Sequence, residues 1–71
     1  MTLTVILEMT ASNWCAFMPD DIGVIFTTAP SREEVIESFR AALTVHLDAM
    51  REEGLNPPTI DHLNIQETVA V

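Results

Sequence analysis

The sequence predicts an α+β fold: an antiparallel β-β-β-α-β sheet of four strands with one helix packed on one face. Three observations lead to this prediction. Both ends of the chain alternate apolar with polar residues, as half-buried strands do. Two short stretches rich in aromatic and β-branched residues follow the first of these ends, separated by turn-forming residues. One long stretch, residues 32–53, repeats its apolar residues at helical spacing.

The first two strands are expected to form a hairpin. Residues 2–9 alternate, and the apolar side chains that share one face are Leu3, Val5, Leu7 and Met9. The turn-forming residues 10–13 follow, and the apolar stretch 14–18 then returns alongside the first strand. Pro19 ends this second strand, because proline cannot donate a hydrogen bond to a neighbouring strand.

The third strand is expected at residues 24–28, which contain β-branched and aromatic side chains. The preceding residues, 19–23, have the composition of a turn, and Gly23 can adopt the positive φ that many turns require. The first three strands are therefore predicted to form an antiparallel meander.

The helix is predicted at residues 32–53. Ser31 and Glu34 form a capping box, in which the serine oxygen accepts from the amide of Glu34 and the glutamate reaches back to the serine amide. The stripe expected to face the sheet consists of Val35, Phe39, Ala42, Leu43, His46 and Met50, widened by Ile36 and Leu47. Gly54 suits the residue that follows a helix, and the prolines after it prevent any continuation.

The last strand is expected at residues 63–71, where the side chains on one face are Leu63, Ile65, Val69 and Val71. One helix covers only one face of such a sheet, yet apolar residues occupy both faces. Trp14 and Met18, for example, alternate with Cys15 and Phe17. An uncovered apolar face or a free strand edge predicts a surface that binds a partner.

Size and charge limit the classes of function. A chain of 71 residues buries only about 60 % of its unfolded surface, which favours a homo-oligomer, a dimer or tetramer. The formal net charge is -8, from 11 acids against 3 arginines, which argues against direct nucleic-acid binding and favours a basic partner. The absence of a leader pattern and of an apolar run near ~20 residues predicts a cytoplasmic protein that does not bind membranes.

No pattern typical of an enzyme stands out. His46 lies on the helical stripe and His62 precedes the last strand, without the spacing of a metal site. Cys15 has no basic neighbour that would activate its thiol. We therefore expect no catalytic residues, no metal and no cofactor. A carboxylate cluster is the alternative reading of Glu8, Asp20, Asp21, Glu37, Asp48 and Glu67, for which solvated surface acids are the commoner explanation.

The expected partner-binding surface combines an apolar anchor with an acidic rim. The anchor residues, predicted to be exposed, are Trp14, Phe17 and Ile25; the rim residues are Asp20, Asp21, Glu52 and Glu53. Acids at a helix C-terminus oppose the helix dipole by about 0.3–1 kcal/mol each. Glu52 and Glu53 are therefore either used by a partner or tolerated as surface charges offset by Arg51.

Several stretches together resemble the HicB-type antitoxins. They are Pro-Asp-Asp-Ile-Gly at 19–23, the capped Ser-Arg-Glu-Glu-Val-Ile at 31–36, and Ala-Leu-Thr-Val-His-Leu-Asp at 42–48 followed by a Glu-Gly pair and two prolines. Family members typically carry Pro-Asp-x-Pro-Gly, a capped Thr/Ser-x-Glu-Glu-Ala-Leu, and Ala-Leu-x-x-His/Tyr-Leu-Glu. The likeness spans residues 2 to about 70 and rests on the order and spacing of the pieces.

This resemblance implies a partial RNase H-like fold and a role in a type II toxin–antitoxin pair. In such a pair the antitoxin binds a small basic HicA-type mRNA interferase and blocks it, a task that an acidic protein suits. Ile22 stands where the family usually has a second proline. The chain is expected to be one HicB-like domain, 1–71, without the C-terminal DNA-binding module of many members.

Two other hypotheses stay open. The first is a stand-alone oligomeric module that is structural or binds a small ligand and has no toxin. The second is a residual RNase H-type nuclease, in which acids such as Glu8 or Glu37 would hold a divalent metal ion.

Overall fold

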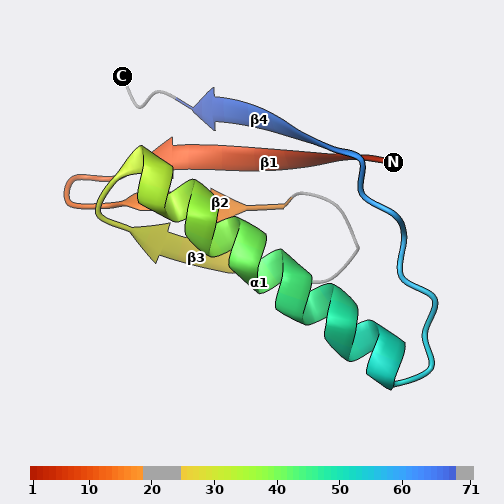
Figure 1. Cartoon of the computed structure of the whole chain (residues 1–71). Coiled ribbons are helices and arrows are strands. Elements are labelled where there is room, and N and C mark those ends of the chain that lie inside the picture. The colour runs from red at the N-terminus through yellow and green to blue at the C-terminus, as the bar shows by residue number, and fades with distance from the viewer. Residues whose placement is uncertain (19–24, 69–71) are drawn as a thin grey trace.

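The computed structural model describes residues 1–18 and 25–68. It contains a sheet and one long helix that crosses it diagonally (Figure 1). The elements in chain order are β1 (Thr2–Met9), β2 (Trp14–Phe17), β3 (Phe26–Ala29), α1 (Arg32–Glu52) and β4 (His62–Thr68). The α+β class and the β-β-β-α-β element order predicted from the sequence are confirmed. The turn predicted at 19–23 lies outside the described residues.

The four strands are arranged in the order β3-β2-β1-β4, and the sheet is mixed. β2 is antiparallel to both β1 and β3, as short connections require. β4 is parallel to β1, with Thr2 opposite His62 and Glu8 opposite Thr68. The prediction of an entirely antiparallel sheet was therefore wrong for the last strand. The reason is α1, which carries the chain back to the end of the sheet where β1 begins (Figure 1).

Local signals define both ends of α1. Ser31 is the N-cap, and its Oγ accepts a hydrogen bond from the Glu34 amide at 3.2 Å. The Ser31 hydroxyl also donates to the Glu34 carboxylate at 2.9 Å, so the two side chains hold one another. At the other end Gly54 has a φ of 80°, and the Leu55 amide donates to the Met50 carbonyl at 2.9 Å. This geometry is a typical helix C-terminus and confirms the predicted stop.

Replacing Gly54 by alanine is expected to lower the free energy of unfolding by about 1–2 kcal/mol, because alanine is strained at positive φ. A Cβ at this position would meet no atom within 4 Å, so the backbone alone determines the cost. Urea denaturation followed by circular dichroism measures it. Gly54→Asn is the matched control, since asparagine tolerates this conformation better. Equal losses for both variants would contradict the explanation.

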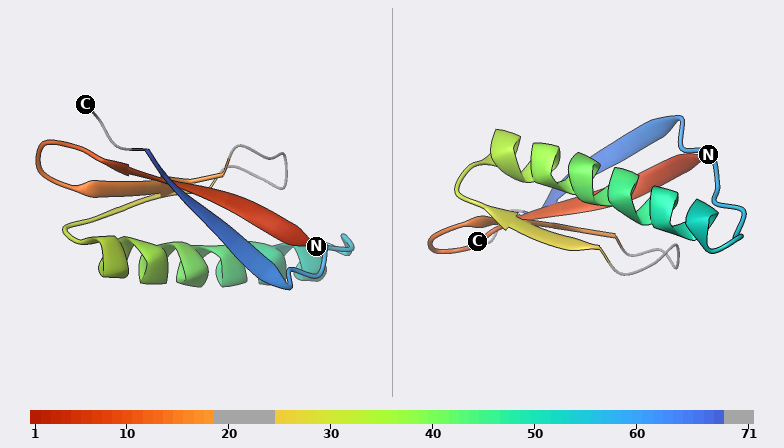
Figure 2. Two further views of the ribbon diagram at one scale, coloured as in Figure 1. Left: turned by 90° about the horizontal axis from the view of Figure 1, so that it is seen from above. Right: turned by 60° about the horizontal axis from the view of Figure 1, so that its bottom comes forward.

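The hydrophobic core lies between α1 and one face of the sheet (Figure 2). Its buried members come from β1, β2, the residues at β3 and the inner face of α1: Leu3, Val5, Leu7, Ala16, Ile25, Ala29, Val35, Phe39 and Leu43. Trp14 and Met18 pack against this cluster from the side. The opposite face of the sheet is not covered by the helix (Figure 2). The prediction that one helix leaves one face open is confirmed for the described residues.

A candidate protein-binding face

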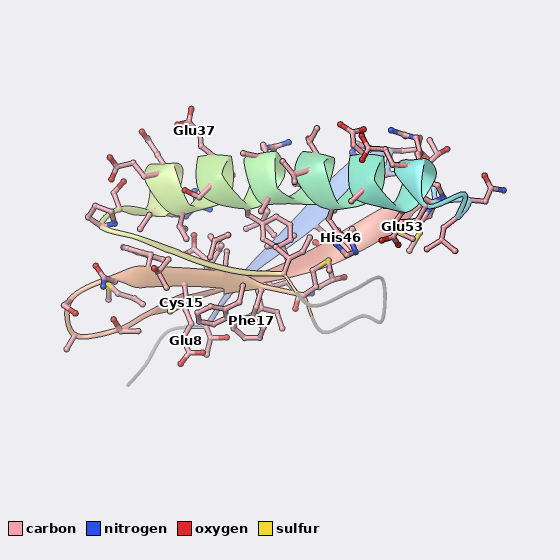
Figure 3. All side chains as sticks on the ribbon, turned by 90° about the horizontal axis from the view of Figure 1, so that it is seen from below. Glu8, Cys15, Phe17, Glu37, His46 and Glu53 are labelled. Carbon is pink, nitrogen blue, oxygen red and sulfur yellow. The ribbon has the colours of Figure 1, made fainter. Side chains whose placement is uncertain are left out.

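The sheet face opposite α1, called the free face below, is formed by alternate residues of all four strands. Strand register places the following residues on it: Thr2, Thr4, Ile6, Glu8, Cys15, Phe17, Phe26, Thr28, His62, Asn64, Gln66 and Thr68. Figure 3 shows Glu8, Cys15 and Phe17 projecting from the sheet on the side away from the helix. The free face is thus built by the same alternation that builds the core on the other side.

An apolar row crosses the free face. Ile6 lies opposite Phe17, and Phe17 lies opposite Phe26, so the three side chains are cross-strand neighbours. The rings of Phe17 and Phe26 are stacked, with centroids 6.3 Å apart and an interplanar angle of 22°. Phe26 is nevertheless 61 % exposed, while Ile6 and Phe17 are half-buried. Large aromatic side chains left open to water in this way are typical of surfaces that bind other proteins.

Charge is distributed unequally over the two sides of the molecule. Glu8 is the one acidic residue on the free face among the described strand residues. The helix and its C-cap, by contrast, carry Glu33, Glu34, Glu37, Asp48, Glu52 and Glu53. Only Asp48 of this group has an ion pair among the described residues, with Arg51 at 2.8 Å. The helix and its C-cap therefore carry six acids against three arginines, a net charge of -3. Among the described strand residues, the free face has Glu8 as its one acid and combines the apolar row with uncharged polar side chains.

Phe26 also borders a second apolar surface on the helix side. A groove of about 530 Å³ runs between α1 and the β3 region, and Ile25, Ala42 and His46 contribute to its lining. Val45 on its rim is 69 % exposed. Because β3 is an edge strand, this groove adjoins unpaired backbone groups of the sheet. The apolar surface of the free face thus continues around the β3 edge.

The structure separates the residues predicted as the apolar anchor. Phe17 lies on the free face, as a binding residue there requires. Trp14 lies on the helix side and is half-buried against the core. Ile25 is 6 % exposed, so the expectation that it is exposed was wrong. The physical reason is alternation: Ile25 has the same parity as Ala29, which faces the helix.

The half of the predicted acidic rim that the structure describes, Glu52 and Glu53, does not join this anchor. Glu52 and Glu53 are exposed at the end of α1, and Figure 3 places Glu53 on the opposite side of the sheet from Phe17. Asp20 and Asp21 lie outside the described residues. Ile6 and Phe26 were not among the predicted anchor residues, although alternation with Val5 and Ile25 marks both as members of the other face.

The acids named for a nuclease do not meet. Glu8 projects from the free face, whereas Glu37 lies on the outer side of α1 (Figure 3). Within residues 1–18 and 25–68, no group of three or more His, Cys, Asp or Glu side chains is placed to hold a metal ion. In the same part of the chain, α1 lacks the apolar length that a membrane-spanning helix needs.

The class defined by this geometry is a small α+β domain with one charge-poor sheet face crossed by an apolar row and one acidic helical side. Comparisons of the chain with protein-family models, with curated proteins and with solved structures gave no match.

Proposed function

We propose that the chain is an antitoxin-like binding protein that neutralises a small basic HicA-type mRNA interferase in a type II toxin–antitoxin pair. One observation carries the proposal. In a chain of net charge -8, the helix side bears six acids, whereas Glu8 is the one acid that the described strand residues place on the free face. Two surfaces of different chemistry suit two kinds of contact. We assign the acidic helix side to the toxin and the free face to self-association.

Electrostatics explains why an acidic helix would inhibit an RNA-cleaving toxin. A protein that binds RNA presents Lys and Arg to the phosphates, and these residues supply most of its affinity. An acidic surface competes for the same side chains, and opposite charge also speeds the encounter of the two proteins. Cytoplasmic localisation, where mRNA is the toxin's substrate, is part of the same proposal.

The element order supports the family part of the proposal. A β-β-β-α-β chain with a single helix on one face is what the resemblance to HicB-type antitoxins implies. The capped helix start at Ser31 and the helix stop at Gly54 coincide with two of the stretches that carry that resemblance. The assignment of a partial RNase H-like fold is part of this proposal and depends on the same resemblance.

Co-expression with the small basic protein encoded by the adjacent reading frame tests the proposal. We expect the two proteins to co-purify. We also expect the chain to restore the growth of cells that express the toxin and to block RNA cleavage by the isolated toxin. Failure to bind this neighbour, or binding without inhibition of cleavage, would contradict an antitoxin role.

Charge variants locate the toxin-binding surface. The double variant Glu37→Gln, Glu52→Gln on the helix side is expected to slow association by about ten-fold at low salt, with a smaller effect at high salt. Glu8→Gln on the free face removes the same kind of charge and is expected to leave the association rate unchanged. Surface plasmon resonance at two salt concentrations measures both. An equal effect of Glu8→Gln would contradict the assignment of surfaces.

A stand-alone oligomeric module is the second candidate, favoured by the apolar row of the free face. It shares the expectation of self-association with the antitoxin proposal but predicts no toxin. Inhibition of the co-expressed neighbour therefore distinguishes the two.

A further inference from the structure

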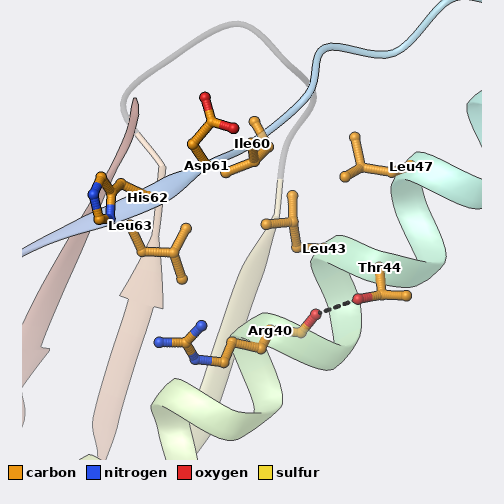
Figure 4. Close-up of a pocket in the computed structure, with 8 residues that line it drawn as sticks. All are labelled: Arg40, Leu43, Thr44, Leu47, Ile60, Asp61, His62 and Leu63. Atoms are coloured by element: carbon orange, nitrogen blue, oxygen red, sulfur yellow. Dashed lines mark hydrogen bonds between the residues drawn. The ribbon is translucent and has the colours of Figure 1, made fainter. Parts of the chain in front are cut away.

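A second cavity lies on the helix side, between the middle of α1 and the start of β4 (Figure 4). Its volume is about 400 Å³, within the range of pockets that bind small molecules. The apolar part of its wall is formed by Leu43, Leu47, Ile60 and Leu63. The cavity lies where residues 60–63 pass beside the middle turns of α1 (Figure 4). It opens on the helix side of the sheet, away from the apolar row of the free face.

Arg40 lines this cavity and has no acidic partner within residues 1–18 and 25–68. Arg32 is paired with Glu67, and Arg51 with Asp48, whereas no salt bridge joins Arg40 to any acid among the described residues. Figure 4 shows its guanidinium extending from α1 across the cavity toward β4. Arg40 is exposed, so its guanidinium is accessible to a ligand that enters the cavity.

The other polar groups of the cavity do not cancel this charge. The Asp61 carboxylate accepts a hydrogen bond from the Met1 amino group at 2.6 Å and is occupied by that ion pair. The Thr44 hydroxyl donates to the Arg40 carbonyl at 3.0 Å, so it is engaged with the helix backbone. His62 borders the cavity, but strand register turns its side chain toward the free face. The cavity therefore presents a cation above an apolar wall.

We propose that this cavity binds a small amphipathic carboxylate, an aliphatic monocarboxylic acid of medium length. The carboxylate would accept paired hydrogen bonds from the planar Arg40 guanidinium, which matches its geometry. The aliphatic tail would lie against Leu43, Leu47 and Leu63 and leave water there. Apolar walls with one well-placed charged group are the common pattern of small-molecule sites. The proposal does not depend on the binding of a toxin.

Titration of the full chain with octanoate, followed by methyl NMR, tests this site. Octanoate is kept below the concentration at which it aggregates. We expect saturable shifts confined to the methyl groups of Leu43, Leu47, Ile60 and Leu63. Octylammonium, which has the same tail and the opposite charge, is expected to give no saturable shifts there. Shifts that fail to saturate, or equal binding of the two amphiphiles, would overturn the proposal.

Arginine variants assign the charge. Arg40→Gln is expected to raise the dissociation constant for octanoate by about five-fold or more, because the charged hydrogen bonds are lost. Arg40→Lys is expected to raise it by less, because lysine keeps the charge. Arg51→Gln removes the same charge at the far end of α1 and is expected to change nothing. Unchanged affinity in a folded Arg40→Gln variant would refute the role of Arg40. Should that variant unfold, the comparison of octanoate with octylammonium on the unaltered chain decides the matter.

Discussion

Replacing Phe39 by alanine is expected to remove most of the folding stability of this protein. Phe39 is 1 % exposed and is the largest of the fully buried side chains among the described residues. It projects from the middle of α1 into the cluster formed with β1 and β2. Removing a buried phenylalanine side chain costs about 3–5 kcal/mol, from lost burial and from the cavity left behind. Small domains have unfolding free energies near the low end of about 5–15 kcal/mol, so little would remain.

Urea denaturation followed by far-ultraviolet circular dichroism measures this loss. The expected result is a transition midpoint at very low urea concentration, with a fraction of the molecules unfolded before urea is added. Val45→Ala is the control on the same helix, because Val45 is 69 % exposed and should cost no more than about 0.5 kcal/mol. A loss below about 1 kcal/mol for Phe39→Ala would mean that α1 does not pack on the sheet as described.

The helix is the element that the sequence predicted best, because the signals at its ends are local. The Ser31 cap and the positive φ of Gly54 depend on residues within one helical turn. The predicted helix, 32–53, exceeds the observed one by a single residue, Glu53, which forms the C-cap. The hairpin of β1 and β2 was predictable for the same reason, since Pro19 and the turn residues limit it locally.

The direction of β4 was not predictable in this way. Alternation in the last stretch shows a strand but carries no information on which way it runs beside β1. That direction depends on where α1 delivers the chain, and the connection of residues 53–61 between helix and strand is a property of the whole fold. The parallel register of Leu3 with Leu63 and of Val5 with Ile65 then follows.

The candidate face shows a related limit. Alternation tells which residues share a face of a strand, and it placed Cys15 and Phe17 together correctly. It does not tell which face of each strand the helix covers, because the register between strands decides that. This is why Ile25 was predicted to be exposed, whereas it lies on the face that the helix covers and is buried. The pairing of Phe17 with Phe26, which creates the apolar row, becomes visible only once the register is known.

Replacing Phe17 by glutamate is expected to convert the proposed dimer into a monomer. Phe17 lies at the centre of the apolar row, between Ile6 and Phe26. In a dimer related by two-fold symmetry, each copy contributes the same patch, so one substitution places two new carboxylates in a single interface. Burying them and bringing them together is expected to raise the dissociation constant by about 100-fold or more. Analytical ultracentrifugation over a range of concentrations measures the change, with a dimer expected for the unaltered chain.

Two matched variants make this result specific to the free face. Leu55→Glu adds the same charge at a residue that is 54 % exposed and lies beyond the helix, and the dimer should persist. Val45→Glu places it at the groove between α1 and β3, which is the alternative contact surface. If the chain is a monomer at every concentration, or if Val45→Glu dissociates the dimer and a folded Phe17→Glu does not, the free face is not the contact. Since the free face carries Glu8 as its one acid among the described strand residues, two copies can approach there with little repulsion despite a net charge of -8 on each.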